Sequence, residues 1–319
     1  MSNYRFIEIN EDVRAEVTNP NFDLKEMEYC VLSSQVELRE IVASNPKLPK
    51  NFAQWMAKDI EPSVRAAISR NASIDSEIIL ALSNDSHLAV ISAVAENPNL
   101  KLERLLELAG HRSYIVRTEV ARNPNASIQI LEKLAKDSEW GVRRSVASNH
   151  GANTNLLTTL AKDPVPEILI AVAENSQTPI EILDQMWTDA PAARKAIVDN
   201  PNCTEEFLIE VFEEALQPTE DQDDTWDDDL RGDTSIRESI ASRPDLSRKL
   251  ISLLIKDPSH YVRRDLAKNI CLTTDDLSTL ALDDDENVRQ AVVNNPNTSS
   301  ESKAAATLLG LPEMESDDE

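Results

Sequence analysis

The sequence repeats itself every 26 residues, and this period limits the folds open to the chain more than any other feature. An asparagine, often followed by proline, marks the frame of each copy, and an arginine, Arg243, takes its place in an eleventh copy. The successive intervals are 26 residues six times, then 25, then 43, then 26 twice. Such a period is the signature of an array of small supersecondary units. The ten asparagines are Asn19, Asn45, Asn71, Asn97, Asn123, Asn149, Asn175, Asn200, Asn269 and Asn295.

The first half of a repeat has the pattern of a short amphipathic helix. In the copy around Asn123, Val116, Val120 and Ala121 are spaced so that they share one helical face. The following Pro124 has no amide hydrogen and biases the preceding residue away from the α region, so the helix should end at Asn123. The asparagine side chain can then bond nearby backbone groups.

The second half of a repeat predicts another short helix. Ser127 is a suitable N-cap. Ile128, Leu131, Leu134 and Ala135 then form an apolar stripe at helical spacing. One such unit cannot bury its apolar faces alone, whereas stacked units can, so the fold class predicted is an all-α solenoid of about eleven 26-residue, two-helix repeats. Val120, Leu131 and Leu134 should lie in its core.

The repeat resembles that of the leucine-rich repeat variant family of bacterial proteins. The resemblance rests on the pattern Val-Arg-x-x-Val-Ala-x-Asn-Pro-Asn followed by Leu-x-x-Leu-Ala-Lys-Asp, and it covers about Val13 to Leu308. It implies a right-handed superhelix without β-strands, in which an α-helix alternates with a 3₁₀-helix. Because the repeat is slightly longer than is usual in the family, the second helix is either a 3₁₀-helix or a fuller helix of the HEAT-like kind.

The resemblance implies no biochemical activity and no cofactor. A relative in that family holds an iron–sulfur cluster on clustered N-terminal cysteines, but the N-terminal region here contains only Cys30. No zinc spacing, phosphate loop or nucleophile elbow occurs in the sequence. The histidines have no helix-spaced carboxylate or cysteine partner, and Cys203 and Cys271 are small residues near helix starts. We therefore expect a non-enzymatic protein without a bound metal.

The organisation expected is one solenoid domain over residues 1–319. Its repeats occupy about 13–216 and 235–308, separated by an acidic insertion at 217–234 and followed by an acidic tail at 309–319. Three widely spaced cysteines indicate a reducing compartment. Neither a secretory signal nor a membrane-length apolar run is present. The prediction is a cytoplasmic protein that does not associate with membranes; its oligomeric state is open, with a monomer expected.

An arginine recurs at one position in the first half of the repeats. Two interpretations are open: a structural ladder in which each arginine pairs with the aspartate that ends the preceding helix, or a track that binds a polyanion. Asp59 precedes Arg65 in this way, and Asp137 precedes Arg143. We favour the ladder, because the two residue types recur together and can form bidentate pairs. The eight arginines are Arg39, Arg65, Arg117, Arg143, Arg194, Arg237, Arg263 and Arg289, and Ile91 and Leu169 interrupt the series.

The acidic insertion is the second candidate site. It contains eight acidic residues and one base. Its spacing imitates a calcium loop, but Arg231 stands where an oxygen ligand is needed, so we expect no metal there. Contact with a basic partner is the better interpretation, with Trp226 as an anchor. Trp55, Trp140 and Trp187 are expected to pack between repeats. The insertion residues predicted to bind a partner are Asp223, Asp224, Trp226, Asp227, Asp228 and Asp229.

The predicted function is that of a protein–protein interaction scaffold. A solenoid offers a long binding surface. The net charge of −25 repels nucleic acid and anionic membrane and favours a basic protein or segment as partner. The alternative is a helical-repeat protein that binds nucleic acid through its arginine-lined face.

Overall fold

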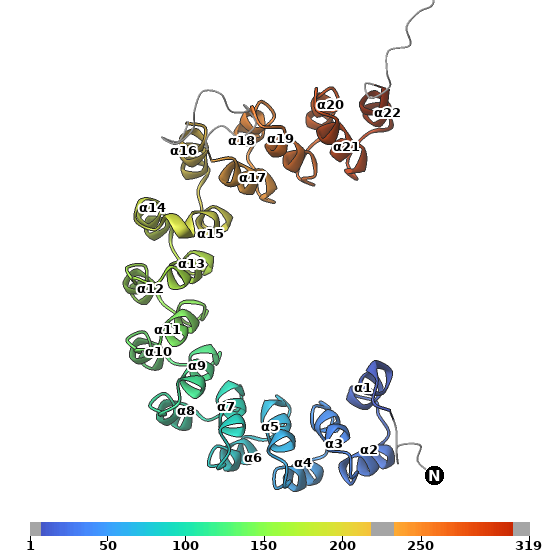
Figure 1. Cartoon of the computed structure of the whole chain (residues 1–319), viewed down its shortest axis with the longest axis vertical. Coiled ribbons are helices and arrows are strands. Elements are labelled where there is room, and N and C mark those ends of the chain that lie inside the picture. The colour runs from blue at the N-terminus through green and yellow to red at the C-terminus, as the bar shows by residue number, and fades with distance from the viewer. Residues whose placement is uncertain (1–7, 218–232, 309–319) are drawn as a thin grey trace, which may run out of the picture. The chain divides into compact units, whose positions relative to one another are not determined.

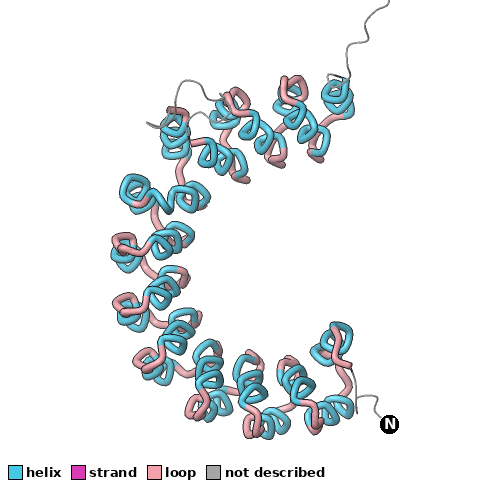
Figure 2. Tube along the Cα trace, in the orientation of Figure 1, coloured by secondary structure: helices cyan, strands magenta, loops and turns pink. Residues whose placement is uncertain are grey.

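A computed structural model describes residues 8–217 and 233–308 of the chain. Within these ranges it contains 22 α-helices, one 3₁₀-helix and no strand (Figures 1 and 2). The helices form eleven successive pairs, one for each predicted repeat. The all-α solenoid of two-helix repeats is therefore confirmed.

Each repeat consists of two α-helices joined by the asparagine turn. The first helices are α1 (Glu11–Thr18), α3 (Val36–Ala43), α5 (Pro62–Arg70), α7 (Leu88–Glu96), α9 (Tyr114–Arg122), α11 (Trp140–Ala147), α13 (Pro166–Glu174), α15 (Arg194–Asp199), α17 (Thr234–Ser242), α19 (His260–Ala267) and α21 (Glu286–Asn294). The second helices are α2 (Leu24–Val31), α4 (Lys50–Met56), α6 (Ser76–Leu82), α8 (Leu102–Leu108), α10 (Ile128–Leu134), α12 (Thr154–Leu160), α14 (Ile180–Asp189), α16 (Glu205–Ala215), α18 (Arg248–Leu254), α20 (Thr274–Leu280) and α22 (Ser300–Leu308).

The second helices are α-helices, not 3₁₀-helices, so the fuller of the two forms considered for them is the one found. The one 3₁₀-helix among the described residues is Pro191–Ala193, which leads directly into α15. It lies in the repeat whose asparagine follows its predecessor by 25 residues instead of 26. The second helix of the preceding repeat, α14, is longer than most second helices, and the first helix of this repeat, α15, is shorter than the other first helices.

The core lies between the two helices of each repeat and between neighbouring repeats. Val120, Leu131 and Leu134 are almost fully buried, as predicted. The helical phase of α10 differs slightly from the prediction, since Ile130 is buried whereas Ile128 is partly exposed. Burying one leucine side chain contributes about 1.5–3 kcal/mol, so helices of seven to nine residues, unstable alone, are held by this packing.

The chain divides into two compact units, unit 1 (Met1–Gln177) and unit 2 (Thr178–Glu319). In unit 1, consecutive first helices pack directly on one another, as α5 does on α7 and α7 on α9. Figure 1 shows the first helices of this unit in one row and the second helices in a parallel row. Unit 2 repeats the arrangement, with α17 packed on α19 and α19 on α21. A single solenoid domain over the whole chain stays a prediction.

Among the described residues, none of the helices combines the length and the apolar character needed to cross a membrane.

Candidate partner-binding surfaces

Within each unit, the repeated asparagine bonds a repeat to the one before it. The Asn123 Nδ2 atom donates to the backbone oxygens of Ala95 at 2.8 Å and Asn97 at 3.0 Å, and its Oδ1 accepts from the Asn125 amide at 2.8 Å. Sequence reasoning found only the local bond. The same two long-range bonds, at 2.6 to 3.2 Å, are made by Asn45, Asn71, Asn97, Asn149, Asn175, Asn269 and Asn295.

Arg243 replaces the asparagine without losing these bonds. Its Nη1 atom donates to the backbone oxygens of Val198 and Asn200, the two acceptors that an asparagine would reach. The rest of its guanidinium binds the Asp245 carboxylate, at 2.9 Å from Nε and 2.7 Å from Nη2. Arg243, held in place by Asp245, thus donates to the same pair of backbone oxygens as the asparagine amide does in other repeats.

The arginines of the ladder bind aspartates, but each carboxylate is the one that follows the second helix of the arginine's own repeat, not the one that precedes its first helix. Arg143 Nε and Nη2 donate to Asp163 Oδ2 and Oδ1 at 2.7 and 3.1 Å, while Nη1 donates to the backbone oxygen of Asp137 at 2.9 Å. The same bidentate geometry, 20 residues apart, holds for Arg39–Asp59, Arg65–Asp85, Arg117–Asp137, Arg237–Asp257 and Arg263–Asp283.

The predicted pairing of Arg143 with the Asp137 carboxylate is therefore wrong, as are the equivalent pairings of the other arginines with the aspartates that precede them. Asp137 does lie beside Arg143, but it offers its backbone oxygen there, because its carboxylate faces Arg117 of the preceding repeat. Its Oδ1 also accepts from the Glu139 amide at 3.0 Å. Four of the six aspartates consequently join two arginines, one through the side chain and one through the main chain: Asp59, Asp137, Asp257 and Asp283. Asp85 and Asp163 bind one arginine, because Ile91 and Leu169 stand where the second would be.

The pairs are shielded from solvent, so the six paired arginines have little exposed surface with which to bind a polyanion. None of the six paired arginine side chains is more than 15% exposed. Hydrogen bonds from Arg65 hold the pKa of the Asp85 carboxyl below its usual value, so this pair is charged at neutral pH. Phosphate binding would require the guanidiniums to leave carboxylates that already satisfy their bidentate geometry.

One of the two interruptions of the ladder is matched in sequence, whereas the residue 20 positions after Leu169 is still an aspartate, Asp189. Ile91 replaces an arginine, and the residue 20 positions later is His111 instead of aspartate. His111 Nδ1 still accepts from the Ser113 amide at 3.1 Å, and its backbone oxygen still accepts from Arg117, so only the ion pair is lost. Arg194 differs again, because its guanidinium lies over the Trp187 ring at 4.7 Å and 3.7 Å from Glu214.

The residue 20 positions after Arg289 is Leu309, so no aspartate occupies the ladder position for this arginine. Its Nη1 atom donates to the backbone oxygens of Asp283 and Asp284, at 2.8 and 2.9 Å. Its Nε atom is buried and has no hydrogen-bond partner. In the six complete pairs this atom donates to a carboxylate, so the guanidinium of Arg289 lacks the hydrogen bond that its equivalents make.

The tryptophans do not all pack as predicted. Trp187 is buried against Phe207 and Arg194, and its Nε1 donates to Glu214 at 2.8 Å. Trp55 and Trp140 are each 49% exposed, so the prediction of inter-repeat packing is wrong for them. Trp55 lies in the last turn of α4 and Trp140 is the first residue of α11, so both flank turns of unit 1 where second helices lead into first helices.

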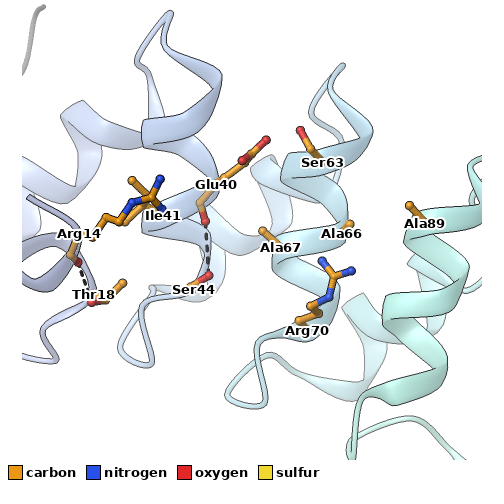
Figure 3. A pocket seen from close by; sticks show the side chains of 10 residues that line it. All are labelled: Arg14, Thr18, Glu40, Ile41, Ser44, Ser63, Ala66, Ala67, Arg70 and Ala89. Carbon is orange, nitrogen blue, oxygen red and sulfur yellow. Dashed lines mark hydrogen bonds between the residues drawn. The ribbon is translucent and has the colours of Figure 1, made fainter. Parts of the chain in front are cut away.

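A hollow of about 560 Å³ opens on the first helices of the N-terminal repeats (Figure 3). Its walls come from α1, α3, α5 and α7. Small side chains, among them Ser63, Ala66 and Ala67, line it, and Arg14, Glu40 and Arg70 stand around them (Figure 3). Arg14 is bonded to Glu37, and Arg70 lies 3.8 Å from Glu96, so the charges around the hollow are largely balanced.

The cysteine thiols are unsuited to nucleophilic chemistry. Burial raises the pKa of Cys30 to about 12 and that of Cys203 to about 11, and it also raises the pKa of Cys271. A nucleophile needs the thiolate, which these thiols do not form near neutral pH. Within residues 8–217 and 233–308, no cluster of three or more His, Cys, Asp or Glu side chains could hold a metal ion.

The insertion residues predicted to bind a partner, Asp223 to Asp229 with Trp226, lie outside the described residues. Next to them, α16 exposes Glu206, Glu210 and Glu213, which share one helical face, and the helix contains no basic residue. Acidic surface is therefore present on the described part of unit 2 as well.

No family model matches the chain, and no curated protein matches it. Among solved structures it is similar to a leucine-rich repeat variant with a novel repetitive structural motif, at 20% identity over 88% of each chain and a TM-score of 0.37. It is also similar to a designed armadillo repeat protein, at 12% identity over 90% of this chain and 98% of the other, with a TM-score of 0.18. The first of these two proteins carries the name of the family that the sequence resembles.

Proposed function

We propose that this protein is a non-catalytic scaffold that binds a basic protein or segment through unit 2. The supporting observation is the uneven distribution of charge. Unit 2 contains 33 Asp and Glu against 13 Lys and Arg, whereas unit 1 contains 24 against 19. Clustered charge of one sign steers an oppositely charged partner toward the surface and repels polyanions.

The acids of α16 are the part of this surface best suited to a basic segment. Glu206, Glu210 and Glu213 follow one another at helical spacing on the exposed face of the helix, and none of them forms an ion pair within the described residues. Lysine or arginine side chains of a partner would meet them without displacing an existing contact. The acids of the insertion at 217–234 extend the same charge in sequence, and we propose that they take part.

The alternative of nucleic-acid binding has less support. It depends on the arginine ladder, whose guanidiniums are bound to carboxylates and shielded from solvent. A catalytic function also has less support. Burial keeps the thiols of Cys30 and Cys203 protonated, and the hollow on the first helices is open to solvent and lined by both polar and apolar side chains.

The test is the binding of a fluorescent 15-residue lysine-rich peptide to the full chain, measured by anisotropy at several salt concentrations. We expect binding that weakens as salt rises, because screening shortens the reach of surface charge. The variant Glu206→Gln/Glu210→Gln/Glu213→Gln should bind more weakly.

The matched control is Glu103→Gln/Glu132→Gln/Glu174→Gln, which removes the same charge from exposed positions of unit 1. It should bind as the parent does. Equal losses in both variants would mean that only net charge matters, and the absence of any binding would overturn the proposal.

A further inference from the structure

One edge of unit 1 combines exposed apolar side chains with unpaired cations. This edge, which we call the entry edge, is formed by the turns that lead from second helices into first helices. Its apolar residues are Trp55, Ile60, Leu88, Tyr114 and Trp140, each of them exposed. Leu88, Tyr114 and Trp140 hold the same position, the first residue of α7, α9 and α11, in three consecutive repeats.

The fold does not explain the apolar row of the entry edge. Side chains that are about half exposed at the same position of successive repeats are not needed to pack one repeat on the next. Tryptophan and tyrosine are the side chains that most often anchor a partner. At its N-terminal end the row meets a hollow of about 370 Å³, whose walls include Trp55 and Ile60. A partner's side chain can enter there.

The charge of the entry edge is opposite to that of the chain. Lys58, Arg112, Lys133, Lys136 and Lys162 are exposed and form no ion pair within the described residues. The Lys133 ammonium reaches the turn at Gly110, where a Cβ would stand 3.2 Å from it.

Two acids that form no ion pair in the described part of the chain, Glu61 and Glu139, oppose these five cations, and Glu107, at the repeat position of Lys133, is paired with Arg104. The aspartates of the edge, such as Asp59 and Asp137, are already neutralised by ladder arginines. The entry edge is thus a basic strip on a protein of net charge −25.

We infer that the entry edge of unit 1 binds an acidic segment of a partner protein that carries large apolar side chains. Charge complementarity fixes the sign of the segment, and the aromatic row fixes its apolar content. Neighbouring first helices lie about 8–10 Å apart. An extended segment of polyproline type advances about 9 Å in three residues, so an apolar residue at every third position would match the row.

A single-stranded nucleic acid would also meet cations and aromatics here, but it fits the entry edge less well. Successive bases stack on aromatic platforms in such complexes. The platforms here are one repeat apart, whereas stacked bases are neighbours along the strand. The inference goes beyond the proposed function, because it concerns the other unit and a partner of opposite charge.

The experiment uses the full chain and a labelled 15-residue peptide with Leu or Trp at every third position and Asp or Glu elsewhere. We expect it to bind, and a peptide with Ser in place of the apolar residues to bind at least about tenfold more weakly. Tyr114→Ser/Trp140→Ser should weaken binding about tenfold or more, and so should Lys136→Glu/Lys162→Glu.

Two matched controls locate the effect. Ile270→Ser/Leu282→Ser removes exposed apolar side chains from unit 2, and Lys47→Glu/Lys101→Glu reverses two exposed lysines next to the asparagine turns of unit 1. Both should bind the peptide as the parent does. Circular dichroism of each variant verifies that it is folded.

Four results would overturn the inference. These are no binding of the apolar acidic peptide, equal effects of the variants and their controls, tighter binding of a 15-nucleotide oligo-dT than of the peptide, and self-association of the parent that Tyr114→Ser/Trp140→Ser abolishes. The last would make a second copy the occupant. None of them bears on the binding of a basic peptide by unit 2, so the two proposals fail separately.

Discussion

Unit 1 and unit 2 are made from the same repeat, yet they differ at the positions that face solvent. Both keep the asparagine bonds and the arginine–aspartate pairs. Unit 1 has nearly balanced charge and an exposed aromatic row, whereas unit 2 has an excess of 20 acids. The positions that join repeats are constrained by backbone hydrogen bonds, and the positions that face solvent are not.

The irregular joints are also unevenly distributed. Unit 2 contains the 25-residue repeat, the arginine that replaces an asparagine and the insertion at 217–234. Its Arg237 is fully buried and donates to the Ala215 backbone oxygen at 2.7 Å, whereas the equivalent Arg143 is partly exposed. The same pair therefore experiences a different environment in each unit, and this difference can be measured.

The largest effect should come from the buried carboxylate of unit 2. Asp257→Ala leaves the Arg237 guanidinium buried without its partner, which should cost about 3–5 kcal/mol of unfolding free energy. Asp163→Ala in unit 1 should cost less, about 1–3 kcal/mol, because water can reach Arg143. Chemical denaturation of the two variants gives the comparison, and equal losses would show that burial does not distinguish the units.

Core truncations should be alike in the two units. Leu134 in α10 and Leu254 in α18 occupy the same repeat position and are both buried. We expect Leu134→Ala and Leu254→Ala to cost about 2–5 kcal/mol each. Urea unfolding followed by circular dichroism measures both, and a variant that unfolds like the parent would mean that its unit does not use this leucine as core.

Removing the asparagine amide should cost less than removing a core leucine. Asn123→Ala leaves the backbone oxygens of Ala95 and Asn97 without a buried donor, a loss of about 1–3 kcal/mol. Arg243→Asn restores the usual residue in unit 2 and should change stability by less than about 1 kcal/mol, because the amide can reach the same two oxygens. A large loss of stability in Arg243→Asn would show that the contact between these two repeats requires arginine.

The smallest effect on stability should come from shortening the insertion. The deletion should span 219–231 and spare Asp233, whose amide donates to the Ala215 oxygen at 2.9 Å and whose side chain caps α17. Since doubling a loop costs only about 0.6 kcal/mol, the melting temperature should barely change. Binding of the lysine-rich peptide should weaken, because seven acids are lost. Unchanged binding would assign the basic partner to the helices of unit 2 alone.

The sequence predicts which positions of the repeats are equivalent better than it predicts which residues touch. Helix pairs and the burial of Val120 and Leu134 follow from the period and the apolar spacing, because both are local properties. The partner of Arg143 was mispredicted because Asp137, six residues away, is the nearer aspartate in sequence, whereas the stacking of helices brings Asp163 to the guanidinium.

The binding surfaces were harder to predict for a related reason. An aromatic near a helix end is compatible with burial or exposure, and only the position of the neighbouring elements decides between them, as for Trp140 and Trp187. The long-range role of the asparagine did leave a signal. Glycine is the common residue after a helix end, so ten asparagines at that place indicate that the amide group itself is used.

The asparagine bonds give the array a direction. Within each unit, the asparagine amide donates to the repeat before it, and the backbone oxygen of the asparagine receives the amide of the repeat after it. A duplicated 26-residue repeat, inserted in frame between two regular repeats, could therefore form the asparagine bonds with both of its neighbours. Gain or loss of whole repeats inside such a regular run would leave the asparagine bonds of the remaining repeats intact.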